Sequence, residues 1–340
     1  MAVSSFQDYL YSIRDRYAKF VSDGILEHTP LWKEIQRANG PPKRYGGIIG
    51  GMGGIFKSLH SDAIQWRILT SLMQVSTWGP GSDIRSKTPN LLGQARVTVG
   101  GYVLSYNFPL FEQMTLGGEE QIVDLIRLYE RMAARTWAQT FEEKAHLDEL
   151  GLNPPGWGGL ATFMKTSGTY AQYIDLSQSY AKPTVFDYSG SGQQFELTAL
   201  DRLTEVINNA THGDVDGETS SPAFGLMNRS DWQKVKNLIE DSRHIVDVDT
   251  ETLKLGFRHF VYDGVRFYWS DPMSKLGINR VYLLNPRYIA VAHAGASLFR
   301  PMQGFAIEGI LGQVYVSVHK GQIFCTNTRF QAMIDNTDKS

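Results

Sequence analysis

Residues 102–135 read YVLSYNFPLFEQMTLGGEEQIVDLIRLYERMAAR, and the hydrophobic period changes within this stretch from that of a strand to that of a helix. The acids Glu119 and Glu120, after Gly117-Gly118, are expected to open the helix, because negative side chains stabilise a helix N-terminus. The helix is predicted to run to about residue 148, which at 1.5 Å per residue is about 45 Å. Its apolar stripe is predicted to hold Ile122, Leu125, Ile126, Tyr129, Met132, Ala133, Trp137, Phe141 and Ala145. This length suits a spine better than an ordinary domain helix.

Before this stretch, the sequence predicts a long hairpin. Residues 63–75 and 95–108 both have strand composition, and the segment between them, which includes Trp78, is rich in Gly, Pro, Ser and charge. One face of the second strand is expected to carry Val97, Val99, Gly101 and Val103. A hairpin of this length cannot all be core, so part of it is expected to project and to be stabilised by another chain.

The first 45 residues are predicted to be an arm of helical pieces that needs another surface to lie on. An amphipathic helix is expected over about residues 5–21, and a second over 30–38, which Gly40-Pro41-Pro42 would stop. The glycine-rich GGIIGGMGG, residues 46–54, lacks the Gly-Lys-Ser/Thr of a P-loop and the third glycine of the dinucleotide fingerprint. It is therefore predicted to be a flexible or turn-rich connector.

After the long helix, GLNPPGWGG at 151–159 is predicted to be a turn that ends it. From 160 to 305 the pattern is that of mixed α/β structure with short elements. Residues 196–210 predict a helix. Residues 222–241 predict a strand and then a helix capped by Ser230, with Gln233 as the reciprocal partner.

Three further strand pairs are predicted towards the C-terminus. Residues 257–271 predict a hairpin that turns at Asp263-Gly264, because Asp-Gly is a strong signal for a tight turn. Residues 279–294 predict two strands broken at Asn285-Pro286. Residues 312–334, GQVYVSVHKGQIFCTNTRFQAMI, predict two short strands around a pivot at 319–321, followed by a last apolar turn.

Composition limits the class of protein. The chain has 340 residues with 42% hydrophobic residues, enough apolar surface to offset the entropy of ordering. The formal net charge is −2, without the basic excess typical of proteins that grip phosphate backbones. A single cysteine, Cys325, excludes an intrachain disulfide and fits a reducing compartment. The N-terminus has no signal-peptide pattern, and no stretch is long and apolar enough to span a bilayer, so we expect a soluble, cytosolic protein.

No pattern of residues points to catalysis. The acidic runs at 214–218 and 247–251 lack the register of a calcium-binding loop and are interpreted as solvated loops. His259 and His293 lie in apolar strands and are interpreted as core or interface residues, and Cys325 as a buried small hydrophobe. No histidine pair has metal-ligand spacing, and no serine lies in a nucleophile elbow. We therefore predict no catalytic, cofactor-binding or metal-binding residues and no enzyme activity.

The order of these parts resembles the major capsid protein of tailed bacteriophages, the Hong Kong phage 97-like fold that is shared with herpesvirus floors and encapsulins. Residues 102–135 resemble the passage from that family's extended loop into its spine helix. GFRHFVYDGVRFYWSDPM and NRVYLLNPRYIAVAHAG resemble a section of its axial domain, and VYVSVHKGQIFCTNTRFQAMI resembles its last strands. The resemblance covers about residues 60–340 and is one of order and texture, because the family has no catalytic signature.

The resemblance implies an α+β fold with five parts. These would be an N-terminal arm (1–60), an extended β-hairpin loop (61–112), a peripheral domain with the spine helix (113–150), a mixed α/β axial domain (151–305), and C-terminal strands that complete the peripheral domain beside the spine helix (306–340).

The resemblance also implies a major capsid protein that assembles with itself, as pentamers and hexamers, into an icosahedral shell enclosing double-stranded DNA. Its partners would be further copies, a separate scaffolding protein, a portal and a decoration protein, with no sequence-specific DNA binding and no membrane. It would be assembled in the host cytoplasm and located in the virion. Some relatives cross-link through a lysine of the extended loop, where Lys87 is the candidate, although a solvated lysine is the alternative reading.

Three alternatives remain open on the sequence alone. The first is an encapsulin-type shell of a cellular nanocompartment, and the second is a self-associating neck or tail component of a phage. The third is a metal-dependent enzyme that would use Asp214, Asp216, Asp247 and Asp249.

Overall fold

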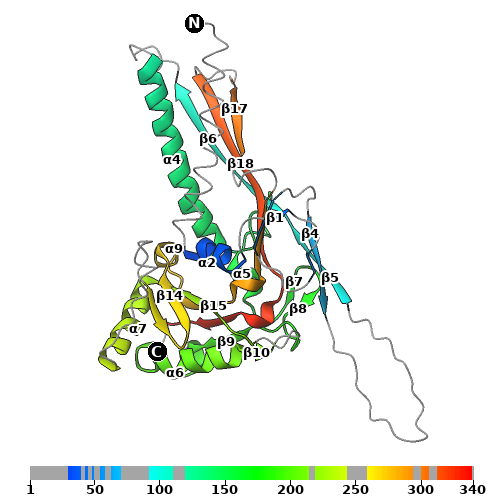
Figure 1. Cartoon of the computed structure of the whole chain (residues 1–340), viewed down its shortest axis with the longest axis vertical. Coiled ribbons are helices and arrows are strands. Elements are labelled where there is room, and N and C mark those ends of the chain that lie inside the picture. Colours follow the sequence, from blue (N-terminus) through cyan, green and yellow to red (C-terminus); the bar gives the residue numbers. More distant parts are fainter. Residues whose placement is uncertain are drawn as a thin grey trace, which may run out of the picture.

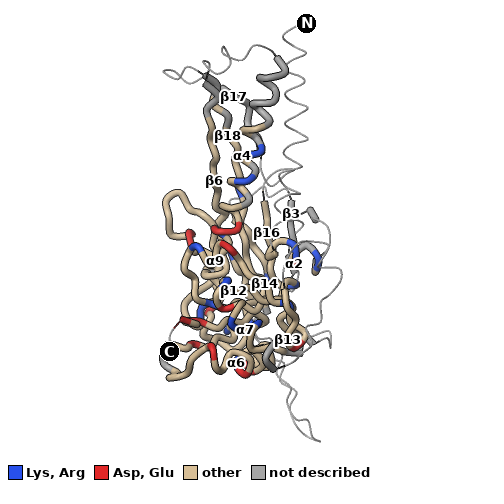
Figure 2. The backbone as a smooth tube through the Cα atoms, turned by 90° about the vertical axis from the view of Figure 1, so that its left-hand side faces the viewer, with Lys and Arg blue, Asp and Glu red and all other residues tan. Residues whose placement is uncertain are grey.

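In the computed structural model of the chain, the described residues are 30–39, 43–44, 48–49, 54–57, 63–69, 92–109, 119–213, 219–242, 259–293, 300–305 and 312–338. A body of short helices and strands carries a long helix and a long sheet on one side, and the strands of a hairpin leave it on another (Figure 1). Basic and acidic residues are interspersed along the described chain (Figure 2), in keeping with the net charge of −2. The predicted helix over 5–21 and the hairpin tip with Trp78 lie outside the described residues.

Helix α4 (Glu119–Ala145) is the predicted spine helix. Trp137 and Phe141 are buried on the face that meets the long sheet, and Trp137 Nε1 donates to Ser317 Oγ at 3.1 Å. Met132 was predicted to lie in the buried stripe, and this is wrong, because its side chain is 58% exposed. At 3.6 residues per turn it stands about 140° around the helix from Trp137, so it points away from the sheet.

The predicted closing hairpin is also wrong, because β18 (Gly312–Cys325) is one continuous strand with no pivot at 319–321. Strand β6 (Gly100–Pro109) pairs with residues 312–321 along one edge of it. On the other edge, β17 (Arg300–Phe305) pairs first, and β16 (Ile289–His293) then pairs with residues 321–325. A Cβ at Gly321 would stand 2.7 Å from the Ala292 carbonyl oxygen, so this glycine permits close strand packing where a turn was expected.

The glycine-rich connector contributes strands to two sheets. Strand β3 (Gly54–Lys57) pairs in parallel with β16 and with β1 (Lys43–Arg44), which extends the long sheet. Strand β2 (Ile48–Ile49) pairs with the hairpin strand β4 (Ala63–Leu69). The region predicted to be a connector is therefore partly ordered as short strands of two sheets.

The predicted hairpin is confirmed in β4 and β5 (Leu92–Thr98), which pair antiparallel from Ala63–Thr98 to Leu69–Leu92. The second strand was expected to continue through residue 108 with Val97, Val99, Gly101 and Val103 on one face. The chain instead breaks at Val99 and continues as β6, and the buried face changes there. Val97 and Val99 are buried, whereas Val103 is 67% exposed, because the even-numbered residues of β6 turn towards α4. Tyr106, for example, stacks on Tyr129 with ring centroids 6.2 Å apart.

A second sheet forms the body at the other end of the molecule. Its strands are, in spatial order, β13 (His259–Tyr262), β14 (Val265–Trp269), β12 (Phe224–Met227), β15 (Arg280–Leu284), β19 (Ala332–Asp335) and β9 (Thr184–Asp187). Alternate residues of β15 enter different cores: Val281 and Leu283 face helices α6 (Phe195–Ala210) and α7 (Arg229–Ser242), and Tyr282 and Leu284 face the core shared with α4. The sheet is therefore buried on both faces.

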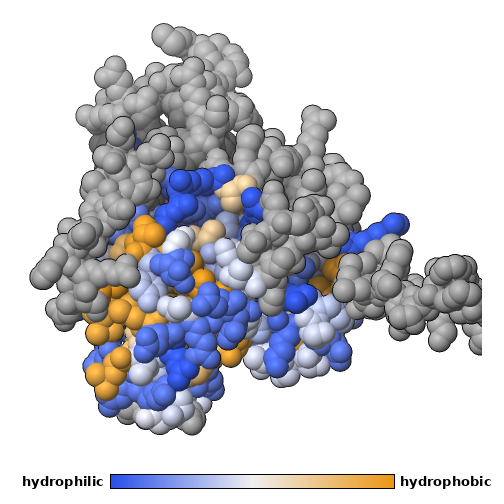
Figure 3. Space-filling view, turned by 60° about the horizontal axis from the view of Figure 1, so that its bottom comes forward, coloured by the Kyte–Doolittle hydropathy of each residue, from blue (hydrophilic) through white to orange (hydrophobic). Residues whose placement is uncertain are grey.

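The predicted helix over 196–210 is confirmed by α6, the strand and helix over 222–241 by β12 and α7, and the break at Asn285-Pro286 by β15, η2 and β16. The hairpin of β13 and β14 turns at Asp263-Gly264, both with positive φ, as an Asp-Gly turn requires. Figure 3 looks onto the end with α6 and α7, where apolar atoms gather along one side of a mostly hydrophilic face. Three large apolar side chains of this part of the chain are exposed: Leu197 of α6, Val261 of β13, and Leu276, which lies between β14 and β15.

The remaining described elements are short: α2 (Pro30–Asn39), α5 (Leu160–Phe163), β7 (Thr169–Tyr170), β8 (Ile174–Asp175), η1 (Tyr188–Gly190), β10 (His212–Gly213), β11 (Thr219–Ser220), α9 (Asp271–Lys275), η2 (Pro286–Tyr288) and η3 (Thr328–Phe330). Helix α2 confirms the helix predicted before Gly40. The five predicted domain boundaries remain predictions. Within the last of them, 306–340, β18 belongs to the long sheet and β19 to the second sheet.

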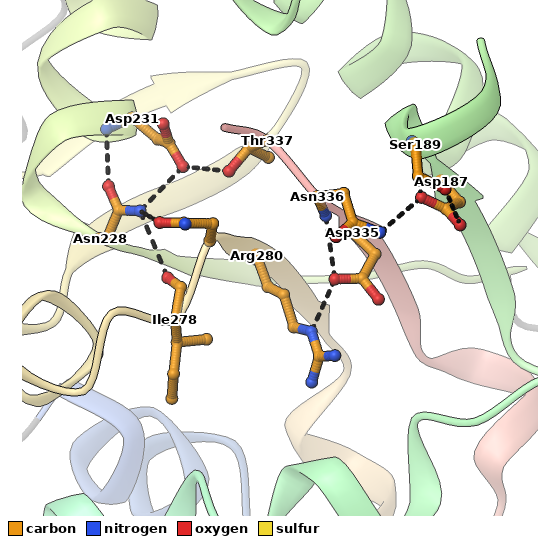
Figure 4. A network of polar contacts seen from close by, with 10 residues as sticks. Asp187, Ser189, Asn228, Asp231, Ile278, Arg280, Asp335, Asn336 and Thr337 are labelled. Atoms are coloured by element: carbon orange, nitrogen blue, oxygen red, sulfur yellow. Dashed lines mark hydrogen bonds and ion pairs between the residues drawn. The ribbon is translucent and has the colours of Figure 1, made fainter. Parts of the chain in front are cut away.

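Asn228 caps helix α7, which corrects the predicted capping by Ser230 and Gln233. Asn228 Oδ1 accepts from the Asp231 backbone N–H at 2.7 Å, and its Nδ2 donates to Asp231 Oδ2 at 3.0 Å (Figure 4). The helix starts two residues earlier than expected, so Ser230 lies within the first turn. The Asp231 carboxylate also accepts from the Thr337 hydroxyl, so the cap holds the C-terminal end of the chain against α7.

The corrected cap predicts different effects for two neighbouring substitutions. Asn228→Ala is expected to lower the free energy of unfolding by about 1–2 kcal/mol, because it removes the capping acceptor. Ser230→Ala, the matched control, should change it by less than about 0.5 kcal/mol, as is usual for exposed positions. Urea unfolding of the two variants measures the difference, and equal losses would contradict the assignment of the cap.

Candidate functional site

Only some of the residues considered for chemistry in the sequence lie among the described residues. The described residues contain no group of three or more His, Cys, Asp or Glu side chains that could hold a metal ion. Asp214, Asp216, Asp247, Asp249 and Lys87 lie outside those residues. None of the described helices is long and apolar enough to cross a membrane.

Cys325 and the two strand histidines lie largely where they were expected. Cys325 is fully buried in β18, and burial raises the pKa of its thiol to about 12, so it is held as a neutral, unreactive group. His293 is buried in β16. His259 is half-buried in β13, with its ring stacked on Tyr268 at 5.5 Å between centroids. The interpretation of these residues as packing groups is confirmed for Cys325 and His293.

What the structure does bring together is a set of aromatic rings where the 151–159 loop meets four other segments of the chain. We call Trp32, Tyr102, Phe141, Trp157 and His319 the Trp157 cluster. The indole of Trp157 is completely buried. Its ring centroid lies 4.0 Å from that of Phe141, 5.1 Å from His319, 5.8 Å from Trp32 and 5.9 Å from Tyr102. The cluster therefore joins the arm helix α2, strand β6, the spine helix α4 and strand β18.

Close backbone packing surrounds the Trp157 cluster. A Cβ at Gly100 would stand 2.2 Å from the Gly156 carbonyl oxygen, and one at Gly159 would stand 2.3 Å from that of Ala145. No side chain could move aside in either case, because the neighbouring atoms belong to the backbone. Gly100 of β6 and Gly159 of the turn thus let the start of β6 and the end of α4 pack directly against the loop that carries Trp157.

A polar group closes one side of the Trp157 cluster. Tyr102 Oη donates to Glu149 Oε2 at 2.9 Å and accepts from the Trp157 backbone N–H at 2.8 Å. Lys144, in the last turn of α4, pairs with the same Glu149 carboxylate. Burial, with the Glu149 carboxylate as a further cause, raises the pKa of the Tyr102 phenol, so it stays a neutral donor. These contacts fix the end of the spine helix relative to β6.

Helix α2 is attached to the second sheet by a buried carboxylate. Glu34 accepts from Tyr268 Oη at 2.8 Å and from Arg266 Nη1 at 3.2 Å, both on β14. On the same helix, Trp32 packs on Phe141 of α4 with ring centroids 5.1 Å apart. The described part of the arm thus bridges the spine helix and the body.

The spine helix meets the body through three polar side chains, which we call the Ser270 joint: Glu142, His146 and Ser270. The buried Ser270 hydroxyl donates to Glu142 Oε1 at 3.3 Å and lies 3.3 Å from His146 Nε2. Burial raises the pKa of the Glu142 carboxyl to about 7 and lowers the pKa of His146 to about 4. Serine stands between the acid and the imidazole and is buried, so the arrangement differs from that of a nucleophilic triad, in which the histidine is central.

The base of the hairpin is fixed to the body by aromatic packing. Trp66 of β4 is buried against Phe324 of β18, with centroids 5.1 Å apart, and lies 6.3 Å from Tyr170. The Arg96 backbone N–H donates to the Ala171 carbonyl oxygen at 2.8 Å. The hairpin therefore leaves the body from a rigid base formed by β4, β5 and β18.

These contacts fix α2, α4, β6, β18 and the hairpin base relative to one another. Sequence reasoning missed the Trp157 cluster because its members come from residues 32, 102, 141, 157 and 319, and only their meeting in space makes them a unit. The one available signal was a tryptophan among prolines and glycines in GLNPPGWGG, which was interpreted only as a turn.

Comparisons with known proteins are consistent with this architecture. No protein-family model matches the sequence, and no curated protein matches it. Among solved structures, the chain is similar to the cyanophage A-1(L) capsid asymmetric unit, with a TM-score of 0.57 and 12% identity over 86% of this chain and 91% of that one. It is also similar to the mature capsid of bacteriophage PhiM1, with a TM-score of 0.53 and 12% identity over 88% and 89% of the two chains.

A third similar structure is the holo-SrpI encapsulin complex from Synechococcus elongatus PCC 7942, with a TM-score of 0.50 and 10% identity over 91% of this chain and 88% of that one. These identities are too low to transfer a function, but each match covers most of both chains. The chain therefore has the α+β capsid fold of the Hong Kong phage 97 type that its sequence predicted.

Proposed function

We propose that this chain is the major capsid protein of a tailed bacteriophage, a structural protein without enzyme activity. It self-assembles as pentamers and hexamers into an icosahedral shell that encloses viral double-stranded DNA. The observation that carries the proposal is the capsid fold, in which a spine helix and a projecting hairpin are both fixed to one body by the Trp157 cluster and the base around Trp66. A rigid body with a projecting hairpin suits a subunit that is completed by its neighbours.

The charge of the chain supports enclosure of DNA without tight binding. The formal net charge of −2 provides no general attraction for phosphate. The proposed partners are further copies of the chain, a separate scaffolding protein, a portal and a decoration protein. The proposed location is the virion, after assembly in the host cytoplasm.

A second candidate is the shell of an encapsulin-type nanocompartment, which the similarity to the SrpI encapsulin favours. Both candidates are closed shells and differ in content. The nucleic acid content of purified particles separates them, because a phage shell packages DNA with its portal present, whereas an encapsulin loads a cargo enzyme.

Assembly of the purified protein tests the proposal directly. We expect negative-stain microscopy and sedimentation to show closed shells, or pentamers and hexamers that close when a scaffolding protein is added. Removal of residues 1–45, or Trp78→Ala in the hairpin segment, should impair assembly and leave a soluble subunit, whereas Trp78→Phe, the matched control, should assemble. A strict monomer under every condition would overturn the proposal. Normal particles from both the chain without residues 1–45 and Trp78→Ala would also overturn it.

A further inference from the structure

One face of the spine helix α4 presents apolar side chains to solvent. Leu128 and Met132 are one turn apart and are 52% and 58% exposed. Arg131 and Arg135 are exposed beside them, and neither has an ion-pair partner among the described residues. In Figure 1 the strands of the long sheet lie on one side of α4, and no labelled element lies on the other. This face is therefore unpartnered within the described part of a single chain.

The character of this face favours a protein surface as its partner. Two adjacent apolar side chains gain by removal from water, and a phosphate backbone gives them no such contact. The two arginines require acidic groups on the partner, because a buried guanidinium without a counter-charge is unfavourable. The occupant must therefore present apolar and acidic residues about one helical turn apart.

The sequence of α4 itself meets that requirement. Glu119, Glu120 and Asp124 precede Leu128 in the sequence, and the exposed Arg131 and Arg135 follow it. Position 124 precedes Leu128 by one helical turn, as Met132 follows it by one turn. A second copy of the helix, antiparallel and centred near Leu128, would thus bring the acidic residues before Leu128 in each copy close to Arg131 and Arg135 of the other, whereas a parallel copy would bring like charges together. Antiparallel helix dipoles favour the same orientation.

We propose that this face of α4 pairs with the same face of α4 in a second copy of the chain, antiparallel across a two-fold axis that passes near Leu128. Leu128 then contacts its equivalent in the second copy, and each Arg131 lies beside position 124 of the other copy. The contact is isologous, so one surface serves both partners. This pairing is one contact between subunits within the proposed self-assembly, and the inference rests on that proposed function.

A single introduced cysteine tests the two-fold axis. The only native cysteine, Cys325, is buried, so Leu128→Cys adds one accessible thiol. In assembled protein, mild oxidation of this variant should give disulfide-linked dimers on a non-reducing gel. Gln139→Cys is the matched control, since it is exposed on the same helix, but its two copies would be about 33 Å apart in the proposed pair. We expect at least ten times more dimer from Leu128→Cys, and equal yields from the two variants would overturn the proposal.

Charge reversal tests the pairing of unlike residues. Arg131→Asp and Asp124→Arg should each lower the assembled fraction in sedimentation by at least tenfold, because each places like charges across the axis. An equimolar mixture of the two variants should recover assembly, since every 124–131 contact between unlike variants again joins opposite charges. This recovery also shows that both variants are folded. Normal assembly of either variant alone, or no recovery in the mixture, would overturn the proposed pairing.

The experiments separate this proposal from the proposed function. If the unmodified chain assembles but Leu128→Cys forms no dimer and both charge variants assemble normally, the shell function stands and the helix pairing is wrong. If the unmodified chain forms no shells, pentamers or hexamers, even with a scaffolding protein, the proposed function fails first.

Discussion

Replacing Trp157 with alanine is expected to lower the free energy of unfolding by about 3–5 kcal/mol, the range typical of large aromatic residues removed from a core. The indole is completely buried and contacts four rings, so its removal leaves a cavity that backbone packing at Gly100 and Gly159 prevents from collapsing. Because the four rings come from α2, β6, α4 and β18, the effect should reach all four elements. Hydrogen exchange should therefore accelerate in each of them.

The matched control is Trp157→Phe, which keeps an aromatic ring at the same place and should lose less than half as much. Trp269→Ala removes a tryptophan from β14, outside the Trp157 cluster, and should leave exchange in α2 and β6 unchanged. Urea unfolding followed by circular dichroism measures the free energies. A loss below about 1 kcal/mol for Trp157→Ala, or faster exchange confined to the 151–159 loop, would show that the cluster does not join the four segments.

Substitutions in the Ser270 joint are expected to change the pH dependence of stability in opposite directions. Burial raises the pKa of Glu142 to about 7, so its stabilising contribution is complete below about pH 4.5 and is lost as the pH rises through 7. Burial lowers the pKa of His146 to about 4, so its contribution is complete above about pH 6.5 and is lost as the pH falls through 4. Each shift in pKa corresponds to a change of about 3 kcal/mol in the free energy of unfolding. For Glu142 this is an upper value, because its side chain is partly exposed.

In the native protein the two contributions offset each other between about pH 4.5 and 6.5. The folded joint holds one proton, on Glu142, and the unfolded chain also holds one, on His146. Folding therefore neither takes up nor releases a proton at this joint, and stability there does not depend on pH. Three charged neighbours also act on the pKa of Glu142: Asp271 and Glu143 raise it, and Lys275 lowers it. Burial remains the largest cause, so the pKa of Glu142 stays raised.

The experiment compares each variant with the wild type at several pH values from 4 to 7.5, which cancels the titration of all other groups. Relative to the wild type, Glu142→Gln should become more stable as the pH rises, and His146→Gln should become less stable. Between about pH 4.5 and 6.5, the double variant should differ from the wild type by a constant amount. Slopes of the same sign for the two single variants would show that the carboxyl and the imidazole do not titrate as their burial requires.

The elements that could be predicted are those fixed by local patterns. The Asp263-Gly264 turn, the Asn285-Pro286 break and the acidic start of α4 follow from backbone chemistry within a few residues. The order of these elements along the chain was sufficient to predict the capsid fold. Local patterns also give the length of α4 to within a few residues, because its apolar stripe ends near the glycine-rich turn.

The errors arose where contacts distant in sequence decide the outcome. Met132 looks like a core residue because it is apolar at helical spacing, yet it lies opposite the sheet. His319-Lys320-Gly321 looks like a turn, but pairing with β6 and β16 keeps the strand extended. Val103 is exposed because β6 pairs with β18 and turns its even-numbered residues towards α4. None of these partners stands near the residue it affects in the sequence.

The continuous strand β18 also sets a condition on when the protein can become complete during synthesis. About 200 residues separate the end of β6 from its partner β18, so at roughly 5–20 residues per second a ribosome needs about 10–40 s to supply the missing strand. Throughout that interval β6 has no β18 to pair with, and β16 and β17, which are made shortly before β18, have none either; β9 and β15 still lack β19. A chain that terminates before β18 therefore leaves both large sheets incomplete, because the long sheet lacks the strand that joins β6, β16 and β17, and the second sheet lacks the strand that joins β15 to β9.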